Sequence, residues 1–315
     1  MVSILRALLV VATLLAFSSS VMAQGGTSRN EILQAPDGFP IHITYYPFKQ
    51  TDDSAGQSPE NAPVVILLPG DGESRLLWDQ NSMPPGNRNL RDPFPVFLQK
   101  QGYAVVTVDL RKHGDSKIPG NESSIQAADY QAMVLGDLVA VKKFLFDEHQ
   151  NRKLNMNKLG IVAVETSAPV AAAFAEYDRK QLPYDDAPVF ANRTPRGQDV
   201  QALSLISPES SAGRLRGTRS LMFLRDPQFD IALQVIVGAE DRDDKGQAKD
   251  LYDAFERSNK GAERIELMKP NFKDRGLELI RRGQGEVYVS ILRFLDTHVK
   301  NHPSQWRDRR SALER

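Results

Sequence analysis

The sequence predicts an α/β fold in which a mostly parallel central sheet carries helices on both faces. Short apolar runs rich in Val and Ile recur along the chain, and segments with helical spacing separate them. Runs without polar alternation suit strands that are buried on both faces. Because strand and helix alternate and no linker is long enough to divide the chain, we expect one domain over residues 39–302.

Six strands and five helices are expected in chain order. The strands are expected at residues 39–48, 63–70, 103–110, 159–164, 200–207 and 231–238. The helices are expected at residues 93–102, 127–149, 167–178, 245–261 and 285–302. The segment between the last two strands, 208–230, has room for about one helix, so we expect little or no cap domain over the sheet.

The two ends of the chain are expected to lie outside this domain. Residues 1–23 combine Arg6, an apolar run and a small-x-small ending at Ala23, which is typical of a cleaved secretory signal peptide. The apolar run is shorter than the roughly 20 residues that a membrane span needs. Residues 24–38 are interpreted as a polar leader, and residues 303–315 as a charged tail that frays.

Composition excludes several classes of function. The 315 residues contain 40 Lys and Arg against 40 Asp and Glu, so no basic surface for nucleic acid is expected. There is no cysteine, which excludes disulfides, thiolate chemistry and cysteine-based zinc sites. The five histidines form no HxH or HExxH pair. We expect no cofactor and no metal.

Three stretches, in this order, resemble the α/β-hydrolase superfamily, in particular its lysophospholipase and serine-aminopeptidase-like branch. VVILLPGDGESRLLWD resembles the strand and oxyanion loop, with Pro69-Gly70 in place of His-Gly. GYAVVTVDLRKHGDS resembles the D-x-R-G-H-G-x-S segment, although Lys112 replaces a glycine. LGIVAVETSAPVAAAFA occupies the place of the nucleophile elbow. The resemblance covers almost the whole chain after the signal peptide and implies the fold of that superfamily.

The elbow's register follows from sterics. The turn is so tight that the residues two before and two after its apex must be small. With Glu165 at the apex these are Ala163 and Ser167, which are both small. Thr166 is the alternative apex, but it would place the bulky Val164 at one of these positions. Glu165 is therefore favoured at the position of the nucleophile.

The resemblance also implies where the other members of a triad would stand. The acid would be Asp241, with Asp243 as a substitute, and Arg275-Gly276 stands where His-Gly is usual. Arg cannot take a proton near neutral pH because its pKa lies above about 12. The triad positions thus read Glu165, Asp241 and Arg275, which is a degenerate set.

The oxyanion-loop positions implied by the family layout are Gly70, Asp71 and Thr166. Carboxylates at positions 71 and 165 would oppose a developing oxyanion. Two other uses of these charges can be stated. Arg275 can form a salt bridge with Glu165 or Asp241, or Asp71, Glu165 and Asp241 can bind a hard cation such as Ca²⁺.

Other candidate residues have plainer interpretations. His113 lies in the loop motif, where we interpret it as structural, and His298 is interpreted as a surface or packing residue of the last helix. Residues 241–246 (DRDDKG) resemble a calcium loop but lack its twelfth-position Glu, so a strand end and a helix start are favoured. The basic run 214–225 is expected to form a helix near the rim of the pocket.

Together these features predict an exported, non-catalytic α/β-hydrolase-like protein. It would bind an unidentified small molecule or protein partner at the carboxyl edge of the sheet. The alternative is an active hydrolase of ester or peptide bonds that uses a non-standard site, which an exposed Thr166 or Ser167 with a basic partner would favour. The sequence does not distinguish periplasm, cell surface and medium as the destination.

Overall fold

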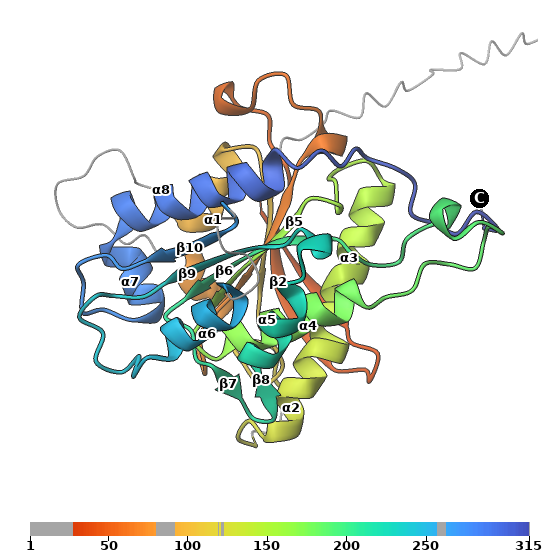
Figure 1. The fold of residues 1–315 in the computed structure, drawn as a ribbon. Coiled ribbons are helices and arrows are strands. Elements are labelled where there is room, and N and C mark those ends of the chain that lie inside the picture. The colour runs from red at the N-terminus through yellow and green to blue at the C-terminus, as the bar shows by residue number, and fades with distance from the viewer. Residues whose placement is uncertain (1–27, 80–91, 119, 121–122, 257–262, 315) are drawn as a thin grey trace, which may run out of the picture.

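The computed structural model describes residues 28–79, 92–118, 120, 123–256 and 263–314 (Figure 1). An eight-stranded sheet forms its centre, and six of the strands run parallel. The two antiparallel pairings join β1 to β2 and β2 to β4. In spatial order the strands are β1 (Arg29–Gln34), β2 (Pro40–Tyr46), β4 (Ala104–Val108), β3 (Val64–Leu68), β5 (Leu159–Val164), β6 (Val200–Ile206), β9 (Ala232–Ile236) and β10 (Ile265–Met268).

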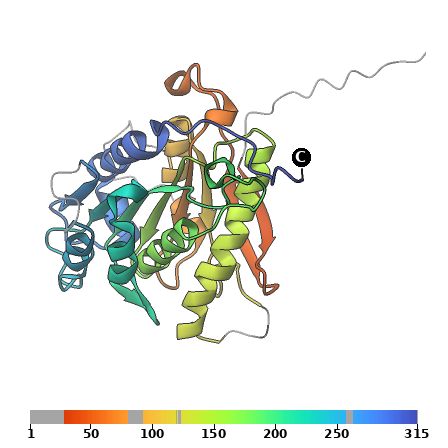
Figure 2. The same cartoon turned by 45° about the vertical axis from the view of Figure 1, so that its right-hand side comes forward.

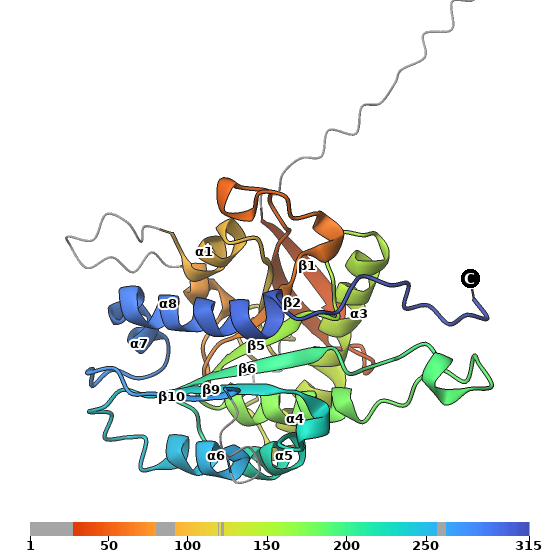
Figure 3. The ribbon, with the colours of Figure 1, turned by 45° about the horizontal axis from the view of Figure 1, so that its top comes forward.

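Helices cover both faces of this sheet, as predicted (Figure 3). A short hairpin, β7 (Ser211–Ala212) and β8 (Leu215–Arg216), precedes α5. The helices are α1 (Phe94–Lys100), α2 (Ala127–Ala132), α3 (Leu138–Gln150), α4 (Ser167–Arg179), α5 (Gly217–Leu224), α6 (Gln247–Glu256), α7 (Gly276–Arg282) and α8 (Gln284–Leu295). None of them, in the part of the chain described, is long and apolar enough to cross a membrane.

The buried residues form two apolar clusters, one on each face. Val64, Ile66 and Leu68 of β3 pack on the face covered by α3 to α6. Val65 and Leu67 face the other side, where α1, α7 and α8 lie. Because successive strand residues point to opposite faces, a run that is apolar throughout fills both clusters. All six predicted strands are present for this reason.

The predicted start of the domain is wrong, two elements were not predicted, and one predicted helix is interrupted. The segment interpreted as a polar leader contains β1, which pairs in register with β2 at the edge of the sheet. Its side chains alternate between half-buried and exposed, so its sequence carries no continuous apolar run. The short edge strand β10 and the helix α7 were also not predicted, and the helix expected at 127–149 is interrupted by a π-helical turn, Met133–Asp137. Residues 1–27, with the proposed signal peptide, and 257–262 lie outside the described residues.

The C-terminal tail packs against the rest of the domain. It runs from the end of α8 to the far end of α3, as Figure 2 shows. Trp306 Nε1 donates to the carbonyl of His149 at 2.8 Å, and the two rings stack with centroids 5.2 Å apart. Arg309 is buried and bonded to Asn157 and Asp199. These contacts make residues 303–314 part of the domain.

Candidate functional site

The turn between β5 and α4 has Glu165 in the left-handed conformation, with φ +49°. Residues other than glycine seldom adopt this backbone conformation. A non-glycine residue in this conformation between a strand and a helix indicates a strained elbow. The Glu165 N–H donates to the carbonyl of Ile206 at 3.0 Å, and its own carbonyl accepts from Ala168 at 3.0 Å. Thr166, the alternative apex, already has right-handed helical angles (φ −64°, ψ −19°).

The two hydroxyls beside the apex are enclosed. Thr166 and Ser167 are both buried, and Ser167 Oγ donates to the carbonyl of Pro69. Among the residues that the structure describes, no histidine is bonded to Glu165, Thr166 or Ser167. Neither hydroxyl therefore has the exposure and basic partner that an activated nucleophile needs.

The Glu165 carboxylate lies over two glycines. A Cβ atom at Gly70 would lie 2.5 Å from Glu165 Oε2, and one at Gly276 would lie 2.9 Å from Glu165 Oε1. Gly276 also has a φ of +59°. The carboxylate thus occupies the space between the loop after β3 and the start of α7, which only glycine backbone leaves open.

Arg275 contacts the side chains at both of the other predicted triad positions, Glu165 and Asp241. Its Nε donates to Glu165 Oε1 at 3.1 Å, and its Nη1 lies 3.5 Å from Asp241 Oδ2. The predicted salt bridge is present and includes both acids. The Arg275 side chain is 20% exposed and that of Asp241 only 2%. The substitute acid, Asp243, is exposed and donates its backbone N–H to Asp241 Oδ1.

Two further carboxylates at the site were not found from the sequence. Glu73 Oε2 accepts the N–H of Gly70 at 2.8 Å, and Glu209 Oε1 lies 3.6 Å from Arg275 Nη2. Glu209 follows β6, whose carboxyl end meets that of β5, so its position after a buried strand was the available signal. Glu73 closes a tight turn, and the sequence shows only that the turn exists.

Burial shifts the acidity of the two carboxyls nearest the glycines. It raises the pKa of Glu165; Arg275 opposes this, and the charges of Glu73 and Glu209 add to it. Burial likewise raises the pKa of Glu73 above its ordinary value, by more than the Gly70 N–H, Arg281 and His113 lower it. A site rich in buried carboxylates holds negative charge at a cost in free energy.

The remaining predicted residues line the edge of this site. Asp71 is exposed, and its Oδ1 lies 3.7 Å from Nε2 of the buried His113. His113 Nδ1 is 3.0 Å from the carbonyl of Arg111. Asp109 of the same motif binds the Arg75 guanidinium and backbone, and a Cβ at Gly114 would overlap its carboxylate. The motif residues therefore hold the loop after β4.

The calcium alternative finds no support in the geometry. Within the described ranges, no three or more His, Asp or Glu side chains are grouped so that they could hold a metal ion. Arg275 instead contacts Glu165 and Asp241 directly.

His298 packs against Phe294, with ring centroids 4.9 Å apart, and is remote in sequence from the elbow. Within the basic run, Gly217–Leu224 forms the predicted helix, α5, whereas Leu215–Arg216 forms β8.

Comparison with solved structures gives esterases and peptidases. An esterase from Pyrococcus furiosus matches with a TM-score of 0.56 and 16% identity, over 87% of this chain and 93% of the esterase. An acylaminoacyl peptidase from Pyrococcus horikoshii matches with a TM-score of 0.58 and 12% identity, over 90% of this chain and 43% of the peptidase. A puromycin-hydrolyzing peptidase from Mycobacterium tuberculosis matches with a TM-score of 0.56 and 12% identity, over 86% and 39%.

No protein-family model matches the sequence, and no curated protein matches it. At these identities the solved structures establish the fold alone. The order of the strands, the left-handed residue between β5 and α4 and the two-sided helical cover agree with this likeness. The chain therefore has the α/β-hydrolase fold.

Proposed function

We propose that this protein is an exported, non-catalytic α/β-hydrolase-like protein that binds a ligand or partner at the carboxyl edge of its sheet. The observation that carries the proposal is the ion pair between Glu165 at the elbow and Arg275 at the position of the base. A guanidinium has no lone pair with which to take a proton, so an arginine at this position cannot activate a hydroxyl or a water molecule.

The charges around the elbow support the same proposal. An oxyanion hole stabilises developing negative charge with N–H donors aimed into a water-excluded site. The family layout places the donors at the N–H groups of Asp71 and Thr166. The Glu73 carboxylate, which accepts the Gly70 N–H, and the Glu165 carboxylate both lie beside Gly70, the neighbour of Asp71 in the chain. Two carboxylates at this place would raise the energy of a tetrahedral intermediate.

Ester hydrolysis by the purified chain tests the proposal directly. We expect no turnover of p-nitrophenyl butyrate and no labelling by a fluorophosphonate probe, in the wild type and in Glu165→Ala alike. Turnover in the wild type that disappears in Glu165→Ala would establish a carboxylate mechanism and overturn the proposal. Fluorophosphonate labelling would instead establish the alternative function, an active ester or peptide hydrolase with a hydroxyl nucleophile.

A designed gain of chemistry provides the matched control. The double variant Glu165→Ser/Arg275→His restores a hydroxyl and an imidazole at the two positions while Asp241 stays in place. We expect fluorophosphonate labelling of this variant and none of either single variant. Labelling of the double variant would show that the assay detects a reactive serine at this elbow. The absence of labelling in the wild type would then show that the wild type has no such nucleophile.

Export is tested at the N-terminus. If residues 1–23 are a signal peptide, the chain purified from its secreting host begins at Gln24. Intact-mass measurement of the product checks this. A mature protein that keeps Met1 to Ala23 contradicts export by cleavage.

A further inference from the structure

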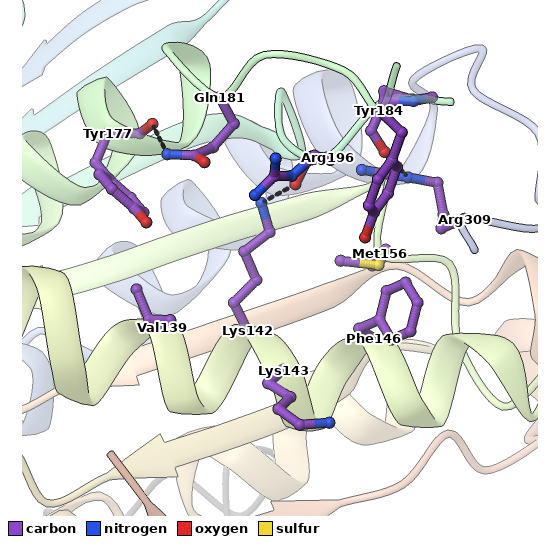
Figure 4. Close-up of a pocket in the computed structure, with 11 residues that line it drawn as sticks. Val139, Lys142, Lys143, Phe146, Met156, Tyr177, Gln181, Tyr184, Arg196 and Arg309 are labelled. Carbon is purple, nitrogen blue, oxygen red and sulfur yellow. Dashed lines mark hydrogen bonds between the residues drawn. The ribbon is translucent and has the colours of Figure 1, made fainter. Parts of the chain in front are cut away.

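A second site lies at the opposite end of α4 from Glu165. A pocket of about 420 Å³ opens between α3, the C-terminal half of α4, the loop after α4 and the tail (Figure 4). Its volume is within the range of small-molecule sites. Since α4 has 13 residues and rises about 1.5 Å per residue, the pocket lies about 20 Å from the elbow. What it binds is therefore independent of the proposed function.

The charged side chains that line this pocket are all cations. They are Lys142, Lys143, Arg196 and Arg309, and no carboxylate is among the lining residues. Two of these cations form ion pairs with carboxylates that do not line the pocket. Lys142 pairs with Asp178 and Asp199, and Arg309 pairs with Asp199. Lys143 is exposed and pairs with Asp147 one turn along α3.

Arg196 provides the uncompensated charge. It is exposed, and within the described part of the chain no carboxylate pairs with it. Its guanidinium lies over the ring of Tyr184, 5.2 Å from the centroid. A guanidinium held on an aromatic face keeps its N–H donors free for a planar anion. The pocket thus carries an uncompensated positive charge at Arg196.

Apart from Gln181, the rest of the pocket lining is apolar or aromatic. Phe146 of α3, the buried Met156 and the ring of Tyr184 lie on one side of Lys142 in Figure 4. Val139 and Tyr177 lie on its other side. Such a surface suits a flat apolar body, and a free inorganic anion would leave it unused.

We propose that this pocket binds a small amphipathic anion, with a ring-sized apolar body against Phe146, Met156 and Tyr184 and its acidic group at Arg196. The Lys142–Asp199–Arg309 ion pairs hold α3, β6 and the tail together, so the walls are fixed before a ligand arrives.

Titration of the full chain with 8-anilinonaphthalene-1-sulfonate, followed by fluorescence, tests the proposal. We expect saturable binding to the folded protein and a loss of about tenfold in affinity for Arg196→Gln, since a charge-assisted hydrogen bond is lost. The control Arg219→Gln removes another exposed arginine, on α5, and should bind like the wild type. Arg196 is exposed, so its variant should keep the wild-type urea midpoint.

Two competitors that share a naphthalene ring distinguish binding that depends on charge from non-specific apolar binding. We expect 2-naphthoate to displace the sulfonate probe from the wild type, and 2-naphthalenemethanol to displace it much less. The uncharged probe N-phenyl-1-naphthylamine should bind the wild type and Arg196→Gln equally. Equal affinity of the sulfonate for the wild type and Arg196→Gln, or an equal loss in Arg219→Gln, would overturn the proposal.

Discussion

At the scale of single residues, Arg275 is a cation that contacts several carboxylates at the elbow. It contacts Glu165, Asp241 and Glu209, and the first two are largely buried. Grouped carboxylates in a low-dielectric site repel one another, and a planar guanidinium can meet more than one of them. The Arg275–Glu165 pair thus stabilises a charge arrangement that would otherwise be costly.

Arg275→Ala should cost about 3 kcal/mol in the free energy of unfolding near neutral pH, because it leaves buried carboxylates unpaired. Glu165→Gln should cost less, since it removes a charge from the cluster. Urea denaturation of the two variants and the wild type measures the difference. Equal costs, or no cost in either variant, would contradict the assignment of this ion pair.

The same variants should respond to pH. Burial raises the pKa of both Glu165 and Glu73. For a carboxyl with a raised pKa, its contribution to stability is fully present below the unfolded value of about 4.3 and is lost as the pH rises through the folded pKa. Without Arg275 this loss deepens, so the deficit of Arg275→Ala should be larger at neutral pH and should shrink as the pH falls towards that unfolded value. A deficit that does not change with pH would contradict the account.

Gly70 tests where the Glu165 side chain lies. An alanine at this position would place its Cβ 2.5 Å from Glu165 Oε2, so Gly70→Ala should destabilise the chain by about 1–3 kcal/mol. In a Glu165→Ala background the cost should fall, because one of the two overlapping side chains is gone. A double-mutant cycle in urea checks this. Simple additivity would place the Glu165 carboxylate elsewhere.

At the scale of elements, the C-terminal tail closes the structure across α3 and β6. Arg309 is 2% exposed and pairs with the fully buried Asp199, to which Lys142 also binds at 2.8 Å. Burial by itself would raise the pKa of Asp199, but the charges of Arg309 and Lys142 hold that pKa well below its ordinary value. Arg309 of the tail therefore compensates the negative charge of the buried Asp199.

Arg309→Ala should cost about 3–5 kcal/mol, the cost of breaking a buried pair from one side. Arg310→Ala, at an exposed residue paired with Asp308, should change stability by less than about 1 kcal/mol. Because the pKa of Asp199 is lowered, its contribution is present above about pH 4 and is lost as the pH falls below that value. The Arg309→Ala deficit should thus shrink in acid, which urea midpoints at several pH values measure.

At the scale of the whole molecule, the two tryptophans report on two different parts of the chain. Trp78 is buried beside Phe94, near the loop after β3, whereas Trp306 belongs to the tail. The chain has no other tryptophan. If the tail is part of the domain, Trp78→Phe and Trp306→Phe should each show a single fluorescence transition.

Each of these transitions should coincide with the circular dichroism of the same variant in urea. A tail that melts first would show as an early change in the variant that retains Trp306. That result would contradict the assignment of residues 303–314 to the domain and would support the frayed tail predicted from the sequence.

The sequence by itself determined the alternation of strands and helices and the elbow at Glu165, and its resemblance to the α/β-hydrolases implied Asp241 and Arg275 as the other members of the set. Apolar runs and helical spacing are local signals, and strands buried on both faces produce them strongly. Small residues on both sides of Glu165 reflect a steric demand of the turn itself. These features could be predicted because neighbours in the chain decide them.

Only the tertiary structure decided the parts whose partners lie far away in the chain. Glu209 meets Arg275, β1 pairs with β2 despite its polar sequence, and Arg309 reaches Asp199 across 110 positions. The pocket around Arg196 likewise joins α3, α4 and the tail. A polar residue carries no local sign of its future burial, because its cost is offset by a distant opposite charge that the chain brings near only when folded.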